Sequence, residues 1–137
     1  MEWNEGRYRI SNDKSLLSFE TICELLSKSF WANKRPKEVI AKSIENSICY
    51  GVYSYDKQIG FGRVVTDYST TYYICDIIID EKYRGKGLGK KLIECILKFE
   101  DLNNKIGILA TKDAHGLYQQ YGFIKDDKTF MRRRPIE

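Results

Sequence analysis

The chain has 137 residues, of which 42% are hydrophobic and 31% charged, with a formal net charge of +4. This length suits one hydrophobic core, so we expect a single domain over residues 1–137. No apolar run approaches the roughly 18 residues that a membrane span needs, and the first residues lack the pattern of a secretory signal. We therefore expect a cytoplasmic protein without a membrane partner.

The four cysteines are widely spaced and the chain contains one histidine, His115. Without a Cys-x-x-Cys pair or ligands at suitable spacing, we expect free thiols and no metal site. Basic side chains are densest at residues 84–91 and 132–134. A small phosphorylated ligand explains the first cluster as well as a nucleic acid does.

Apolar periodicity and turn residues predict the secondary structure of the first half of the chain. A short strand is expected at residues 7–10, followed by an amphipathic helix from Ser15 that ends before Pro36 and a second helix after it. A β-hairpin follows at residues 48–66. The β-branched and aromatic run at residues 71–79 is typical of a central strand that is buried on both faces.

In the second half, a helix is predicted from Gly87 or Leu88 to about residue 100, then a strand at residues 106–110. A short helix is expected at residues 113–121, and a last hairpin at residues 123–133. This element order predicts an α/β fold of mixed α+β character: a central mixed, largely antiparallel sheet flanked by about four helices.

Residues 84–89 read Arg-Gly-Lys-Gly-Leu-Gly, between the apolar strand and the amphipathic helix. Glycines at the positive end of a helix leave backbone N–H groups accessible, so this stretch predicts an anion site. It is not a Rossmann fingerprint, because Lys90 or Leu92 stands where the last glycine is needed. It is not a Walker loop either, because Lys91 replaces the required Ser or Thr.

The same stretch resembles the Arg/Gln-x-x-Gly-x-Gly/Ala signature of the GNAT superfamily of acyl-CoA-dependent N-acyltransferases. The segment at residues 116–123, Gly-Leu-Tyr-Gln-Gln-Tyr-Gly-Phe, is similar to the Leu-Tyr-x-x-x-Gly-Phe segment of the family. Together with the strand before the loop, the resemblance covers residues 71–124. It implies a GNAT-like fold, acetyl-CoA as the co-substrate, and acetyl transfer to a primary amine by direct attack through a tetrahedral intermediate.

The resemblance also implies the cofactor site. The pyrophosphate is expected on the backbone of the loop and the pantetheine arm along the preceding strand, with the N–H of Ile78 polarising the thioester carbonyl. The cofactor-binding residues expected in this way are Ile77, Ile78, Ile79, Arg84, Gly85, Lys86, Gly87, Leu88, Gly89 and Lys90.

Two candidates follow for the catalytic chemistry. Tyr118 occupies the family position of the general acid, which protonates the departing thiolate. Asp76 is a carboxylate in an apolar strand, expected on the same face as Ile74 and Ile78, where burial could raise its pKa. Asp76 is therefore a candidate general base or amine ligand, with a structural role as the alternative. His115 is a weaker candidate, since a surface histidine is the commoner case.

The acceptor site is expected at the junction of the first two helices, where family members line it. Phe30, Trp31 and Arg35 are the candidates, and core packing or an exposed link is the alternative. The acceptor is left open between small molecules and peptides, as is an acyl group longer than acetyl. We expect a monomer or homodimer without a nucleic-acid partner. The alternatives are a noncatalytic acyl-CoA-binding or sensory module and a small basic nucleic-acid-binding domain.

Overall fold

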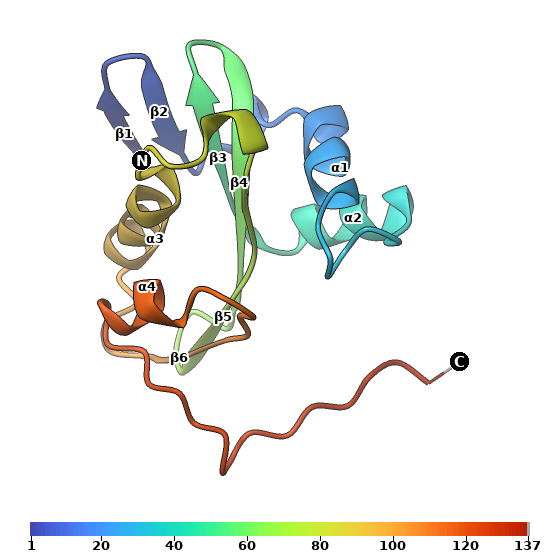
Figure 1. The fold of residues 1–137 in the computed structure, drawn as a ribbon, viewed down its shortest axis with the longest axis vertical. Helices are drawn as coiled ribbons and strands as arrows, with labels where there is room; N and C mark the ends of the chain where they lie inside the picture. Colours follow the sequence, from blue (N-terminus) through green and yellow to red (C-terminus); the bar gives the residue numbers. More distant parts are fainter. Residues whose placement is uncertain (137) are drawn as a thin grey trace.

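The computed structural model describes residues 1–136, and a six-stranded sheet forms the centre of the molecule (Figure 1). The strands lie side by side in chain order. Neighbours are antiparallel except for the last two, which are parallel. The strands are β1 (Glu2–Glu5), β2 (Tyr8–Ser11), β3 (Ile48–Ser54), β4 (Lys57–Thr66), β5 (Thr71–Ile79) and β6 (Ile106–Leu109). The predicted mixed, largely antiparallel sheet is confirmed.

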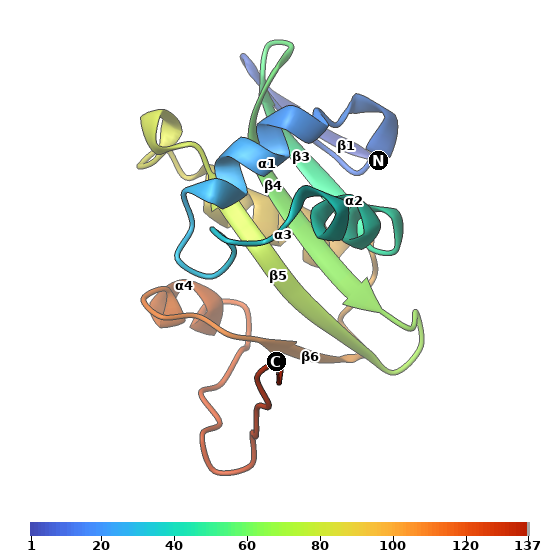
Figure 2. The same ribbon diagram turned by 90° about the vertical axis from the view of Figure 1, so that its right-hand side faces the viewer.

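Four α-helices flank this sheet, and the longest of them, α3, connects the two parallel strands. Figure 2 shows α1 and α2 in front of the sheet and α3 behind it. Within residues 1–136, no helix combines the length and the apolar character that crossing a membrane requires. The helices are α1 (Phe19–Ser27), α2 (Lys37–Glu45), α3 (Leu88–Phe99) and α4 (His115–Gln119), with short 3-10 turns at Lys14–Leu16 and Glu81–Tyr83.

Each face of the sheet has its own hydrophobic core. On one face, Ile22 and Leu26 of α1 pack with Phe61 and Ile78 of the sheet. On the other face, the apolar stripe of α3 packs with strand residues and with Tyr118 of α4. Helices cover both faces of most of β4 and of the second half of β5, whereas Thr71 and Tyr73 in the first half of β5 are exposed, so the expectation of a strand buried on both faces holds only for its second half.

The N-terminal elements differ from the prediction in two ways. The first strand is paired with an additional strand, β1, through a two-residue turn at Gly6–Arg7. Only Trp3 among the residues of β1 is partly buried, so apolar alternation gives no signal for this strand. The helix expected from Ser15 begins at Phe19, because the hydroxyl of Ser18 accepts a hydrogen bond from the N–H of Thr21 and caps it.

The predicted hairpin at residues 123–133 is wrong. Residues 124–136 form no strand, and all of them are exposed (Figure 1). A strand persists in water when one of its faces is buried, and this segment has no such face in the structure. The segment contains few apolar residues. They are flanked by the charged run Asp126-Asp127-Lys128 and by residues 132–134, which are all arginine.

Two features of β5 prepare the functional site. First, Asp76 has a φ of +57°, and Asp76 and Ile77 together lie opposite Gly62 of β4, which makes a β-bulge. Second, the pairing of β5 with β6 ends at Ile74 and Leu109. The second half of β5 therefore has an unpaired edge on the side of β6, where the two strands diverge (Figure 2).

Candidate active site

The glycine loop joins β5 to α3 and presents unpaired backbone donors. Gly85 and Gly87 have φ values of +79° and +78°, a left-handed conformation that glycine adopts without strain. Gly87 is the N-cap of α3 and offers no side chain to the helix, and the first turn of α3 contains no acidic residue. The N–H groups of residues 88–90 have no hydrogen-bond partner within residues 1–136. Such a turn fits an anion.

Arg84 holds the loop against the strand that precedes it. Its Nε donates a hydrogen bond to the carbonyl oxygen of Ile79 over 3.0 Å. On the other side of the turn, the N–H of Lys82 donates to Oδ1 of Asp80 over 3.0 Å. Lys86 and Lys90 are exposed, so both cations are free to approach a bound anion.

The unpaired edge of β5 lies directly before this loop. The N–H of Asp80 donates to the carbonyl oxygen of Ile59 over 2.7 Å, so residue 80 faces β4. Because backbone groups alternate along a strand, Ile78 also faces β4, whereas Ile77 and Ile79 present their N–H groups to the unpaired edge. This geometry does not favour Ile78 as the donor to a ligand at that edge, and Ile77 is the better-placed candidate.

Asp76 is buried and accepts three hydrogen bonds. Its Oδ1 accepts from Nε1 of Trp31 over 2.9 Å. Its Oδ2 accepts from Nη1 of Arg35 over 2.9 Å and from Nε of Arg63 over 2.8 Å. Arg63 in turn donates from Nη1 to Oγ of Ser47 over 3.0 Å. The carboxylate is thus tied to β4 and to the segment between α1 and α2.

The pKa of Asp76 lies below its ordinary value. Burial acts to raise this pKa, but hydrogen bonds and charge from Arg35 and Arg63 outweigh the cost of burial. The raised pKa expected from the sequence is therefore wrong, because the two arginines were not foreseen. The bulge also breaks the alternation: Ile74 packs with the α3 core and Ile78 with the α1 core, so the two do not share a face.

The candidate acceptor residues meet around this carboxylate. Phe30 is 64% exposed and Trp31 is 42% exposed, so core packing does not explain Phe30. The two rings are 5.1 Å apart at their centroids in an edge-to-face arrangement. Nζ of Lys112, from the segment after β6, lies 5.2 Å from the centroid of the Phe30 ring. Arg63 and Lys112 were not identified from the sequence, although a lone arginine inside the apolar strand β4 is a signal for a buried ion pair.

Tyr118 lies on α4 and belongs to the core that α3 covers. It is 8% exposed, and its ring meets that of Phe123 edge to face, with centroids 5.8 Å apart. Burial raises the pKa of Tyr118, so the hydroxyl stays protonated at neutral pH. This hydroxyl makes no hydrogen bond within residues 1–136. His115, the weaker catalytic candidate, lies at the start of the same helix and is exposed.

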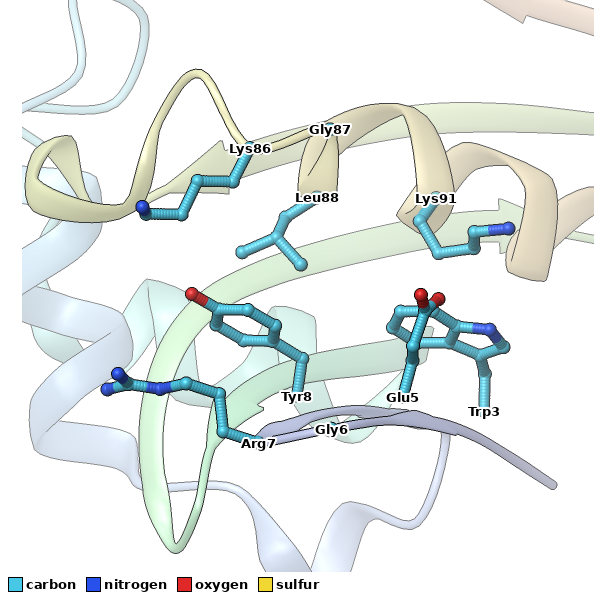
Figure 3. Close-up of a pocket in the computed structure, with 9 residues that line it drawn as sticks. All are labelled: Trp3, Glu5, Gly6, Arg7, Tyr8, Lys86, Gly87, Leu88 and Lys91. Carbon is cyan, nitrogen blue, oxygen red and sulfur yellow. The ribbon is translucent and has the colours of Figure 1, made fainter.

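A cavity of about 420 Å³ lies between the β1–β2 hairpin and the start of α3 (Figure 3). Nζ of Lys91 contacts Oε2 of Glu94 over 2.9 Å and lies over the ring of Trp3. The cavity was not predicted, because the hairpin was not. Its lining includes Trp3, Arg7, Tyr8, Lys86, Leu88 and Lys91. In the part of the chain that the structure describes, no three or more His, Cys, Asp or Glu side chains form a group that could hold a metal ion.

The fold and the loop define an acyltransferase of the GNAT type, and comparisons with known proteins agree. The model of the acetyltransferase (GNAT) domain matches residues 45–125. An uncharacterized N-acetyltransferase, ycf52, from Gracilaria tenuistipitata var. liui is 31% identical to this chain, over 92% of this chain and 75% of the relative. The chain belongs to the GNAT acetyltransferase family.

Solved structures show the same fold. A crystal structure assigned to the GNAT family, from Xanthomonas campestris pv. campestris, matches with a TM-score of 0.88 and 33% identity over 96% of each chain. A GNAT family acetyltransferase from Elizabethkingia anophelis, solved with acetyl-CoA bound, matches with a TM-score of 0.67 and 23% identity. That match covers 90% of this chain and 80% of the other.

Proposed function

We propose that this protein transfers the acetyl group of acetyl-CoA to a primary amine of a small molecule or peptide. The observation that carries the proposal is the unpaired edge of β5, which leads into the uncapped first turn of α3. Peptide-like groups pair with a free strand edge, and a diphosphate binds at a helix N-terminus. An acyl-pantetheine arm that ends in a diphosphate matches both features in the right order. The acetyl-CoA bound to the Elizabethkingia relative supports the same donor.

Bound acetyl-CoA supplies an activated thioester to this site. The N–H of Ile77 faces the unpaired edge and is suited to stabilise the negative charge that develops on the thioester oxygen. Tyr118 is the candidate for returning a proton to the departing thiolate, because its phenol is protonated at neutral pH. We assign no side chain as general base, since Asp76 is held by two arginines and its pKa is lowered.

The donor half of the proposal is tested by thermal unfolding with acetyl-CoA, free CoA and ATP. A ligand that binds the folded state raises its apparent stability, so both CoA species should raise the Tm and ATP should not. The transfer half is tested by thiol release with a panel of amines and peptides. Absence of a Tm shift with either CoA species would reject the donor. Binding without thiol release from any acceptor would favour a noncatalytic acyl-CoA-binding module.

A further inference from the structure

The Trp31 loop, residues 29–36 between α1 and α2, is anchored by the burial of Ser29 and Ala32 and by hydrogen bonds to one carboxylate of the sheet. Asp76 accepts one hydrogen bond from Trp31 and another from Arg35, near the two ends of this loop. A third bond, from Arg63, fixes the carboxylate to β4. Asp76 directly precedes Ile77 in the same bulge, where the unpaired edge of β5 is available to a donor. The loop thus lies beside the place where an acceptor must react.

The side chains around this carboxylate carry an excess of positive charge. Arg35, Arg63 and Lys112 belong to one chain of contacts that includes a single acid, Asp76. Asp113, next to Lys112, forms no ion pair within residues 1–136. The loop itself contains Lys34 and Arg35 and no acidic residue.

Arg35 retains binding capacity. It donates to Asp76 through Nη1, and its Nε and Nη2 have no partner within residues 1–136. Its side chain is 23% exposed, so these donors are accessible to a ligand while the carboxylate holds the guanidinium in one orientation. A guanidinium fixed in this way suits a carboxylate or a phosphate, which accept hydrogen bonds from its planar donors. The exposed rings of Phe30 and Trp31 provide an apolar flank.

We propose that the Trp31 loop selects acceptor amines that carry an anionic group, with Arg35 binding the carboxylate or phosphate and Asp76 acting as its positioning residue. This inference rests on the proposed acetyl transfer to an amine and narrows its acceptor class. Polycationic amines fit poorly, because they would bring further positive charge to a surface that already has an excess of it.

Acceptor binding can be measured without turnover by NMR of the indole N–H of Trp31. The chain has two tryptophans, so the variant Trp3→Phe assigns the signal. With CoA at saturation, matched amines are titrated: phosphoethanolamine against ethanolamine, and 6-aminohexanoate against 6-aminohexanol. The anionic member of at least one pair should bind about tenfold more tightly than its neutral twin, the gain of one charge-assisted hydrogen bond. The pairs separate phosphate from carboxylate as the recognised group.

Variants test the two roles. Arg35→Gln should abolish the preference for the anion while the affinity for CoA stays the same. Lys28→Gln, which removes an exposed cation paired with Glu24 on α1, should leave the preference intact. Asp76→Asn should raise the acceptor KM about tenfold with a smaller change in kcat. Asp76→Glu, which keeps the charge, should raise the acceptor KM less than Asp76→Asn does. Thermal unfolding of each variant with CoA checks that the fold is retained.

Equal affinity within both pairs, or a preference that survives Arg35→Gln, would overturn this inference. A fall in kcat without a change in acceptor KM in Asp76→Asn would overturn the positioning role. The proposed function is rejected by a different result, namely that the wild-type protein does not bind CoA. A wild-type protein that binds CoA but neither anion contradicts the acceptor class alone.

Discussion

The proposed donor and acceptor sides of the site consist of different chemical groups. The donor side consists of backbone groups: the unpaired edge of β5 and the first turn of α3, contiguous in sequence from residue 77 to residue 90. The acceptor side consists of side chains from distant positions, with hydrogen bonds that join residues 41 and 45 positions apart. A backbone site is expected to tolerate side-chain changes that do not alter its charge or conformation. A side-chain site should respond to each substitution.

The largest effect is expected at Tyr118, the proposed proton donor of the reaction. Replacing it by phenylalanine removes the proton donor, so kcat should fall about 100-fold or more, the usual contribution of a positioned acid. The Kd for acetyl-CoA should change little, because the ring remains packed. Steady-state kinetics and calorimetry provide the two values. Tyr121→Phe, which removes another hydroxyl near the same helix, is the control, and equal activity in both variants would reject the assignment.

The next effect concerns the stability of the acceptor side. Asp76→Asn leaves Arg35 and Arg63 without their counter-charge, and breaking a buried ion pair costs about 3 kcal/mol. Because the folded pKa of Asp76 is lowered, its stabilisation is present above the unfolded pKa of about 3.9 and is lost as the pH falls through the folded value.

Urea unfolding at several pH values measures this effect. Wild type should lose stability below about pH 4, and the difference from Asp76→Asn should shrink there. A difference that stays constant across this range would show that the charge of Asp76 does not stabilise the fold.

A smaller effect is expected for the charge of the donor loop. Lys90→Glu places an acid in the first turn of α3, where it is favourable for the helix, so the Tm of the free protein should be unchanged or slightly higher. The affinity for acetyl-CoA should fall about tenfold, because the new carboxylate repels a diphosphate. Lys98→Glu makes the same charge change in the last turn and should leave binding intact. Equal loss of affinity in both variants would mean that only net charge matters.

The contrast also explains what the sequence could predict. The place and conformation of the glycine loop could be predicted because its glycines and its position between a strand and a helix are local signals, and the backbone conformation depends on them directly. Strands β2 to β6 and the four helices were predicted in the correct order, whereas β1 was missed because it lacks apolar alternation. The bulge at Asp76 could not be predicted, since it depends on pairing with Gly62 of β4. It places Ile74 and Ile78 on opposite faces of the sheet, although strand alternation predicts the same face.

The same limit applied to the partners of Asp76. The sequence indicated Trp31 and Arg35 as acceptor candidates and Asp76 as a titrating carboxylate, but not that the three are bonded to one another. When the contacts of Arg63 and Arg35 are unknown, burial alone predicts a raised pKa for Asp76. The pKa is instead lowered, because these contacts outweigh burial. The last hairpin failed for a related reason, because its residues find no partner to bury them.

The central claim, that acetyl-CoA binds along the unpaired edge of β5 and on the first turn of α3, is tested most directly by backbone amide NMR with CoA. The amide signals of Ile77, Ile79 and residues 88–90 should shift strongly on binding. The signal of Ile78 should shift much less, because its N–H faces β4. Shifts confined to other parts of the chain, such as residues 132–134, or an absence of binding would contradict this account.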